Sequence, residues 1–166
     1  CVMLAAGLPI VPGTDSFDTQ DEGIRLADTL GFPLLIKATA GGGGRGLRVV
    51  RTGSDLDPGL ATARREAVTA FGDGRLYLER YIDEPRHVEL QIVADHTRVV
   101  LVGDRECTLQ RRHQKLLEEA PAVGLSEPSR HRLGDLVVAA ARAVGYRGVG
   151  TFEFLVDRHG EPFFIE

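Results

Sequence analysis

Residues 34–50, LLIKATAGGGGRGLRVV, predict a short apolar strand, a glycine-rich loop and a second apolar strand. Four adjacent glycines are costly to order, and they suit a backbone that must approach a ligand closely, typically phosphate oxygens. Of the 20 Lys and Arg residues, only Lys37 and Lys115 are lysines. Each of the two could mark a place that needs a compact ammonium group, or could simply reflect a coding bias toward arginine.

The glycine pattern fits a flap over a triphosphate better than the two commonest nucleotide motifs. Gly41, Gly43 and Gly46 match G-x-G-x-x-G, but a dinucleotide site needs a helix directly after the loop, and residues 47–50 predict a strand. Arg45-Gly46 does not supply the Gly-Lys-Ser/Thr of a P-loop. A strand–loop–strand flap remains, with a glycine loop that binds no ligand as the alternative.

The composition is that of a globular protein, with one domain or two small lobes in 166 residues. A net charge of −4 argues against general nucleic-acid binding, and no apolar run has the length of a membrane span. Cys1 and Cys107 fit neither a metal site nor a disulfide framework, which favours a reducing, cytoplasmic location. The first ten residues lack the basic region of a signal peptide, and we expect the chain to be a piece of a longer one.

Periodicity and turn residues predict an α+β fold. In the first half, a helix over 19–30, strands over 33–38, 47–51 and 76–81, and a helix to about Phe71 capped by Ser54 or Asp55 form a small antiparallel unit. In the second half, we expect a half-buried strand over 87–94, with Glu89 and Gln91 on its polar side, and a hairpin partner over 97–104. A helix over 126–144 and a hairpin over 148–157 and 161–166 follow.

Two groups of charged residues could carry chemistry in this second half. Glu153 and Glu166 lie within apolar segments of paired strands, where a carboxylate is costly unless it is paired or binds a metal such as Mg²⁺. Alternatively, both could face solvent. The run from Gln110 to Lys115, followed by Glu118 and Glu119, could form an anion site or a solvated charged surface.

Six segments, in the observed order and spacing, resemble the ATP-grasp core of biotin carboxylase over nearly the whole chain. The glycine loop is shared with other ATP-grasp enzymes, whereas the segments at 110–115 and 118–121 are more specific. The segments are residues 37–46, 79–82, 85–89, 110–115, 118–121 and 150–154.

The resemblance implies an ATP-grasp fold in which residues 1–8 end a preceding domain or linker, 9–81 form the flap lobe, and 82–166 begin the larger lobe. ATP would be held between the lobes. Lys37 and the glycines of the loop resemble phosphate contacts, and Lys115 resembles a catalytic lysine near bicarbonate. The implied ATP-binding residues are Lys37, Gly41, Gly42, Gly43, Gly44, Gly46, Glu79, Tyr81, Ile82, His87, Gln110, Leu155 and Ile165; the implied ligands of Mg²⁺ or Mn²⁺ are Glu153 and Glu166.

The activity implied is ATP-dependent carboxylation of biotin by bicarbonate through carboxyphosphate. The implied partners are a biotin carboxyl carrier domain, which presents the biotin, and a carboxyltransferase component, within a homo-oligomeric parent protein. Because family residues that hold bicarbonate and biotin fall outside this sequence, we expect these 166 residues alone not to carboxylate biotin. Two alternatives stay open: another bicarbonate-activating ligase, such as a carbamoyl-phosphate synthetase module, and a non-catalytic nucleotide-binding module.

Overall fold

The computed structural model describes residues 2–41, 47–111 and 114–166. The chain forms two compact units, one of Val11–Ile82 and the other of Cys1–Ile10 with Asp83–Glu166. We call them the flap unit and the sheet unit. The domain limits of 1–8, 9–81 and 82–166 stay a prediction; in the structure the first ten residues, including α1 (Val2–Ala5), belong to the sheet unit.

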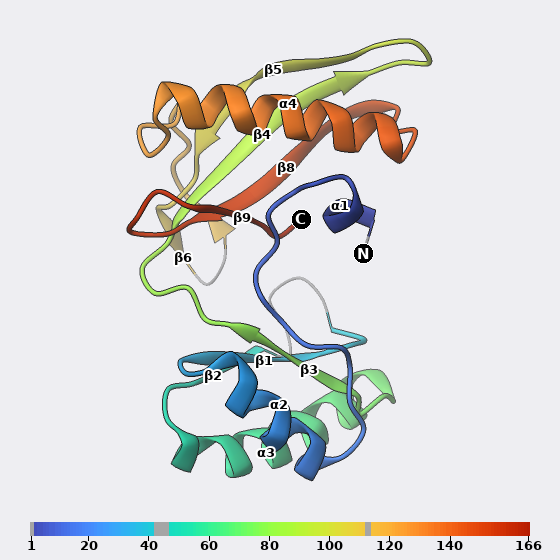
Figure 1. Cartoon of the computed structure of the whole chain (residues 1–166), viewed down its shortest axis with the longest axis vertical. Coiled ribbons are helices and arrows are strands. Elements are labelled where there is room, and N and C mark those ends of the chain that lie inside the picture. The colour runs from blue at the N-terminus through green and yellow to red at the C-terminus, as the bar shows by residue number, and fades with distance from the viewer. Residues whose placement is uncertain (1, 42–46, 112–113) are drawn as a thin grey trace. The chain divides into compact units, whose positions relative to one another are not determined.

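The flap unit is a three-stranded antiparallel sheet covered by two helices. The strands β1 (Leu34–Ala38), β2 (Leu47–Val50) and β3 (Leu76–Arg80) have the order β2-β1-β3. The helices α2 (Gln20–Leu30) and α3 (Gly53–Phe71) lie on one face of this sheet (Figure 1). The core between them is apolar and contains Phe17, Ala27, Leu34, Ile36, Leu56, Leu60, Leu76 and Leu78.

The ends of the two helices follow local chemistry. Thr19 caps α2 by accepting a hydrogen bond from the Glu22 N–H, and Gly31 ends it with a positive φ of 74°. The prediction for α3 was wrong at its start, because Thr52 is the N-cap and the predicted caps lie inside the first turn. The Thr52 hydroxyl donates to the Asp55 carboxylate at 2.6 Å, so Asp55 supports the first turn without being its cap.

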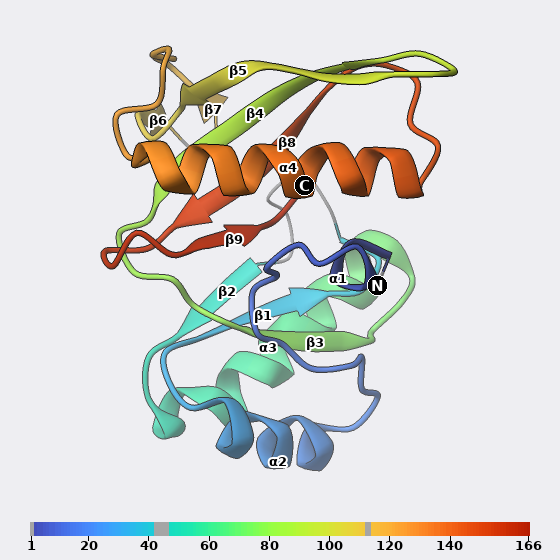
Figure 2. The ribbon, with the colours of Figure 1, turned by 45° about the horizontal axis from the view of Figure 1, so that its top comes forward.

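The sheet unit contains a four-stranded antiparallel sheet of order β5-β4-β8-β9. Its strands are β4 (Arg86–Ala94), β5 (Val99–Glu106), β8 (Gly148–Val156) and β9 (Pro162–Phe164). Helix α4 (Glu127–Ala143) covers one face (Figures 1 and 2), and Ser126 caps it, as the sequence predicts. The core under α4 includes Val88, Leu90, Ile92, Leu133, Val137, Phe152 and Phe154.

A partly buried ion pair also joins α4 to the sheet. Asp104 on β5 is buried, and both of its carboxylate oxygens accept hydrogen bonds from Arg130 Nε at 3.0 and 3.1 Å. Arg130 also donates to the Ala122 carbonyl and to Glu127. Because every charge here has a partner, the pair fixes α4 against β5 without leaving a buried charge unsatisfied.

The pairing of β4 with β5 contains an irregularity that decides which β5 side chains face α4. Gln91 pairs with Gly103, but the next residue, Ile92, pairs with Leu101, so Val102 is an extra residue on β5. A bulge of this kind changes the alternation of side chains. As a result, Leu101 and Asp104 both face α4 although they are three residues apart.

The other face of the sheet is approached by a short hairpin. It consists of β6 (Gln110–Arg111) and β7 (Gln114–Lys115), which pair antiparallel beside the carboxyl end of β5 (Figure 2). Within the described residues, no helix combines the length and the apolar character needed to cross a bilayer.

Candidate functional site

Three charged residues form a row across the face of the sheet that lies opposite α4. Arg105 on β5 lies directly opposite Glu89 on β4, and Glu89 lies directly opposite Glu153 on β8. Two like charges directly opposite each other on neighbouring strands are destabilising. The row therefore needs further positive charge near its two carboxylates.

Lys115, from the β6–β7 hairpin, supplies that charge. Its Nζ lies 2.5 Å from Glu89 Oε2 and 2.6 Å from Glu153 Oε1, so one ammonium group bridges the two carboxylates. Arg105 donates to the remaining oxygen of Glu89 through Nε, at 2.7 Å, and through Nη2. The result is a chain of alternating charges from Arg105 to Glu153.

The charges in this row stabilise one another's ionised forms. The Glu89 side chain is only 4% exposed, and this burial alone would raise the pKa of Glu89. Hydrogen bonds from Lys115 and Arg105 outweigh the burial and hold the pKa of Glu89 below its usual value. Burial likewise lowers the pKa of Lys115, but its bonds to Glu153 and Glu89 outweigh that effect and raise the pKa above the usual value.

His87 and Gln110 complete the surroundings of Glu153. Gln110 Nε2 donates to the Cys107 carbonyl at 2.8 Å and lies 2.9 Å from His87 Nδ1. Because the amide N–H donates, Nδ1 accepts, which places the imidazole proton on Nε2. His87 Nε2 then donates to Glu153 Oε2 at 2.8 Å. Both oxygens of Glu153 are thus engaged, one by Lys115 and one by His87.

The second predicted metal ligand is Glu166, and its backbone is hydrogen-bonded to that of Glu153. The Glu153 N–H donates to the Glu166 carbonyl at 2.7 Å, and the Ile165 N–H donates to the Glu153 carbonyl at 2.9 Å. The Glu166 side chain is exposed, unlike that of Glu153. Leu155, predicted as an apolar wall, lies on the same strand face as Glu153 and directly opposite His87.

In the flap unit, two of the predicted nucleotide-binding residues contact each other. Lys37 Nζ lies 2.6 Å from Glu79 Oε2, with each side chain 21% exposed. The ammonium also lies 5.8 Å from the centre of the Tyr77 ring. In contrast to Lys115, this lysine has a single carboxylate partner among the described residues.

The remaining predicted contacts of the flap unit lie near the strand ends. The Tyr81 N–H donates to the Pro33 carbonyl at 3.0 Å, Ile82 is 9% exposed, and the Gly41 N–H donates to the Ala38 carbonyl. The predicted phosphate contacts Gly42, Gly43, Gly44 and Gly46 lie outside the described residues.

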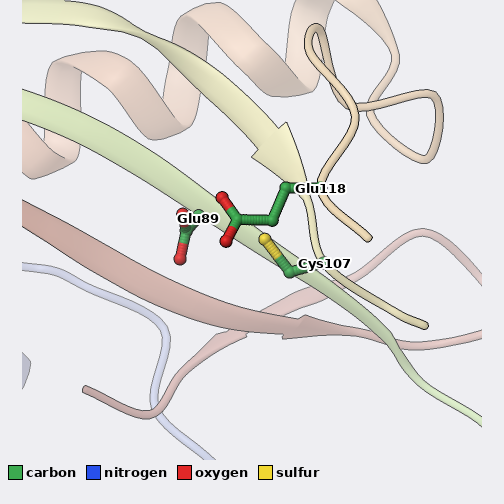
Figure 3. A group of neighbouring side chains, drawn as sticks. All are labelled: Glu89, Cys107 and Glu118. Carbon is green, nitrogen blue, oxygen red and sulfur yellow. The ribbon is translucent and has the colours of Figure 1, made fainter. Parts of the chain in front are cut away.

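One group of possible metal ligands is present among the described residues: Glu89, Cys107 and Glu118 (Figure 3). Burial, followed by the nearby charge of Glu89, raises the pKa of the Cys107 thiol to about 11, so it is neutral near pH 7. Metals bind the thiolate, which the Cys107 environment disfavours. These three side chains are therefore a poor metal centre.

Sequence analysis assigned no role to Glu89 or Arg105, and it placed Glu89 on the polar side of its strand. The structure keeps Glu89 on the side opposite Val88 and Leu90, but Glu89 is buried there. Arg105 covers it from β5, and Lys115 covers it from β7. The flanking Val88 and Leu90 were the available signal, since an acid between apolar residues also singled out Glu153.

Comparison with known proteins identifies relatives over the whole chain. Sequence identity is 49% with biotin carboxylase 1, chloroplastic, of Populus trichocarpa and 47% with biotin carboxylase of Nostoc sp.; each match covers 99% of this chain, and 31% and 37% of the relative. The crystal structure of a biotin carboxylase-beta-gamma-ATP complex from Campylobacter jejuni matches with a TM-score of 0.92 and 50% identity. It covers 99% of this chain and 37% of that chain.

A second solved structure is the biotin carboxylase domain of 2-oxoglutarate carboxylase from Hydrogenobacter thermophilus, in complex with MgADP, ADP and bicarbonate. It matches with a TM-score of 0.91 and 46% identity, over 99% of this chain and 37% of that chain. These matches confirm the α+β, ATP-grasp fold class and the resemblance to biotin carboxylase. The chain spans about a third of the length of these relatives.

The family model described as the carbamoyl-phosphate synthase L chain, ATP binding domain, matches residues 1–166. Since that model covers the whole chain, this protein belongs to the ATP-binding domain family of the carbamoyl-phosphate synthase L chain, and within it resembles the biotin carboxylases.

Proposed function

We propose that this chain is the ATP-binding part of a biotin carboxylase. In the proposed reaction, bicarbonate attacks the γ-phosphorus of ATP, giving carboxyphosphate and ADP. Carboxyphosphate releases CO₂ and phosphate, and a ureido nitrogen of carrier-bound biotin captures the CO₂. The observation that carries the proposal is the half-buried Lys115, held by two carboxylates, in a chain up to 50% identical to biotin carboxylases.

In the sheet unit, the donor chemistry of Glu153 and Glu166 fits Mg²⁺ or Mn²⁺, because both cations prefer carboxylate oxygens. A divalent cation there offsets the negative charge on phosphate oxygens. His87 orients Glu153 through its Nε2–H, and Gln110 holds His87 in the tautomer that this bond requires. Lys115 binds bicarbonate or carboxyphosphate through its ammonium group, which stays charged because of its two carboxylate partners.

In the flap unit, Lys37 contacts the phosphates of ATP, assisted by the backbone of the glycine loop at 41–44 and 46. Glu79, Tyr81 and Ile82 contact the adenine. Leu155 and Ile165 of the sheet unit supply apolar contacts for the base. A compact ammonium suits this task because it can turn from Glu79 to a phosphate oxygen without losing its charge.

The partners proposed for the longer protein are bicarbonate, a biotin carboxyl carrier domain and a carboxyltransferase component. Its assembly as a homo-oligomer stays a prediction. So does a cytoplasmic location, since relatives include proteins named as chloroplastic and mitochondrial. The acyl or other acceptor depends on the carboxyltransferase component.

The test of this proposal is a calorimetric titration of the protein with ATP, performed once in the presence of Mg²⁺ and once in the presence of EDTA. We expect binding to weaken in EDTA and in Glu153→Gln. The matched control Glu161→Gln removes an exposed charge from the same unit and should leave binding unchanged. Lys37→Met should also weaken binding, relative to its control Arg48→Met. If Glu153→Gln binds MgATP like the unchanged chain, the metal-ligand assignment is wrong.

A second measurement separates biotin carboxylation from carbamoyl-phosphate synthesis. In the complete protein that contains this chain, ATP hydrolysis in bicarbonate should rise when free biotin is added. Dependence on ammonia instead of biotin would favour the second activity. ATP binding with no hydrolysis under either condition would favour a non-catalytic nucleotide-binding module.

A further inference from the structure

Lys115 occupies the carboxylate that the proposed function assigns to a divalent cation. Its Nζ lies 2.6 Å from Glu153 Oε1, while His87 holds Oε2. The same Nζ lies 2.5 Å from Glu89 Oε2. The Lys115 ammonium is therefore shared between Glu153, which is proposed to bind the metal, and Glu89, for which no role has yet been proposed.

An ammonium group and a divalent cation compete for Glu153 Oε1. Positive charges a few ångströms apart repel strongly in a half-buried site, where the effective dielectric constant is well below that of water. Glu153 and Lys115 are 18% and 25% exposed, so solvent screens this repulsion only in part. A cation that binds Glu153 Oε1 therefore favours displacement of the Lys115 ammonium.

Glu89 gives the displaced ammonium a place to stay. Arg105 fixes its other oxygen, and Arg105 is itself held by Gln91 Oε1 at 3.1 Å. Gln91 in turn donates to the Gly150 carbonyl on β8 at 2.7 Å. Glu89 is thus anchored on two neighbouring strands, whereas the flexible Lys115 side chain can move between its partners.

We propose that Glu89 is a positioning residue, which holds Lys115 when a divalent cation takes Glu153. This proposal rests on the proposed function, because it assumes that Glu153 binds the metal. Once released from Glu153, the ammonium keeps one bond to Glu89 and has donors free for an anion. Metal binding would thus prepare the lysine that receives bicarbonate or carboxyphosphate.

The proposal predicts opposite effects for two substitutions. Lys115→Met removes the competing ammonium and should tighten Mn²⁺ binding about tenfold, as expected for the loss of one charge-assisted contact. Glu89→Gln removes the second anchor, which leaves Lys115 on Glu153, and should weaken Mn²⁺ binding about tenfold. A general loss of folding would weaken binding in both variants, so it cannot imitate this pattern.

The experiment is a titration of the nucleotide-free protein with Mn²⁺, in which electron paramagnetic resonance reports the free ion. Arg86→Met is the charge-matched control for Lys115→Met, because Arg86 pairs with Glu106 instead. Glu161→Gln is the control for Glu89→Gln. Both controls should bind Mn²⁺ like the unchanged protein. Glu89→Asp keeps the charge on a shorter side chain and should restore part of the affinity, and melting curves establish that each variant is folded.

Glu153→Gln separates the two proposals. If it loses Mn²⁺ binding while the Lys115 and Glu89 variants bind normally or change in the same direction, the role of Glu89 is refuted and the metal site stands. If it binds Mn²⁺ normally, the metal site is wrong and the role of Glu89 fails with it. Absence of Mn²⁺ binding in both the unchanged protein and Lys115→Met also overturns the proposal.

Discussion

The two units of this chain each carry a lysine beside a carboxylate, but they hold it differently. In the flap unit, Lys37 pairs with Glu79, and both side chains are 21% exposed. In the sheet unit, Lys115 pairs with two carboxylates, one of which is 4% exposed. The first lysine can turn to a ligand at little cost, whereas the second must be displaced from a nearly saturated network. Similar residue types therefore offer different chemistry because their partners differ.

The largest expected effect tests whether each unit depends on its own core. Phe154 is fully buried in the sheet unit and contacts Phe164. Phe154→Ala should destabilise that unit by about 4 kcal/mol through lost burial and a cavity. Amide hydrogen exchange should then accelerate in β4 and β8 but not in β1 and β3. Equal acceleration in both units would contradict their independence.

The next largest effect is expected from removing the carboxylate that holds each lysine. Glu89→Gln should cost about 2 kcal/mol, because it removes charge-assisted bonds from Arg105 and Lys115 in a buried place. Glu79→Gln should cost less than about 1 kcal/mol, because its pair is more exposed. Urea unfolding measures both values. Equal costs would show that the two lysines are held alike.

The pH dependence sharpens the same comparison. The pKa of Glu89 is lowered from its ordinary 4.5, so its stabilising effect is complete above pH 4.5 and disappears as the pH falls through the folded-state pKa. The pKa of Lys115 is raised from 10.5, so its effect is complete below pH 10.5 and is lost at higher pH. The stability difference between the unchanged protein and Glu89→Gln should therefore shrink below pH 4.5. A difference that stays constant down to pH 2 would contradict this.

The smallest effect concerns one buried helix glycine in each unit. A Cβ at Gly23 of α2 would lie 2.6 Å from a ring carbon of the buried Phe17, so Gly23→Ala should cost about 1.5 kcal/mol. A Cβ at Gly134 of α4 would meet a terminal methyl of Leu101 at 2.7 Å, and its next neighbour lies at 4.0 Å. Since that methyl can rotate away, the helix propensity of alanine, about 1 kcal/mol, should leave Gly134→Ala nearly neutral. Thermal melts of both variants test this difference.

Sequence patterns predicted the elements well because the signals are local. Thr19 and Gly31 delimit α2, and Ser126 caps α4, as the sequence predicts. The predicted cap of α3 was wrong because three neighbouring polar residues, Thr52, Ser54 and Asp55, offer similar side-chain oxygens. Propensity alone does not rank such neighbours.

The candidate site was harder to predict because its contacts are distant in sequence. Alternation showed which side of β4 Glu89 is on, but not that Arg105 and Lys115 cover that side. The family motifs singled out Lys115 and Glu153, and in the structure Lys115 Nζ lies 2.6 Å from Glu153 Oε1. The contacts of Gly42, Gly43, Gly44 and Gly46 stay predictions, since these residues lie outside the described part of the chain.

The extra residue on β5 has a consequence for how this strand tolerates change. On one side of Val102, Leu101 packs under α4; on the other, Arg105 reaches Glu89. Deleting Val102 would restore strict alternation and turn one of these two side chains to the wrong face. A substitution at this exposed position should be harmless. Removal of the same residue would cost either the packing of Leu101 under α4 or the ion pair of Arg105 with Glu89. At this point the number of residues matters more than their identity.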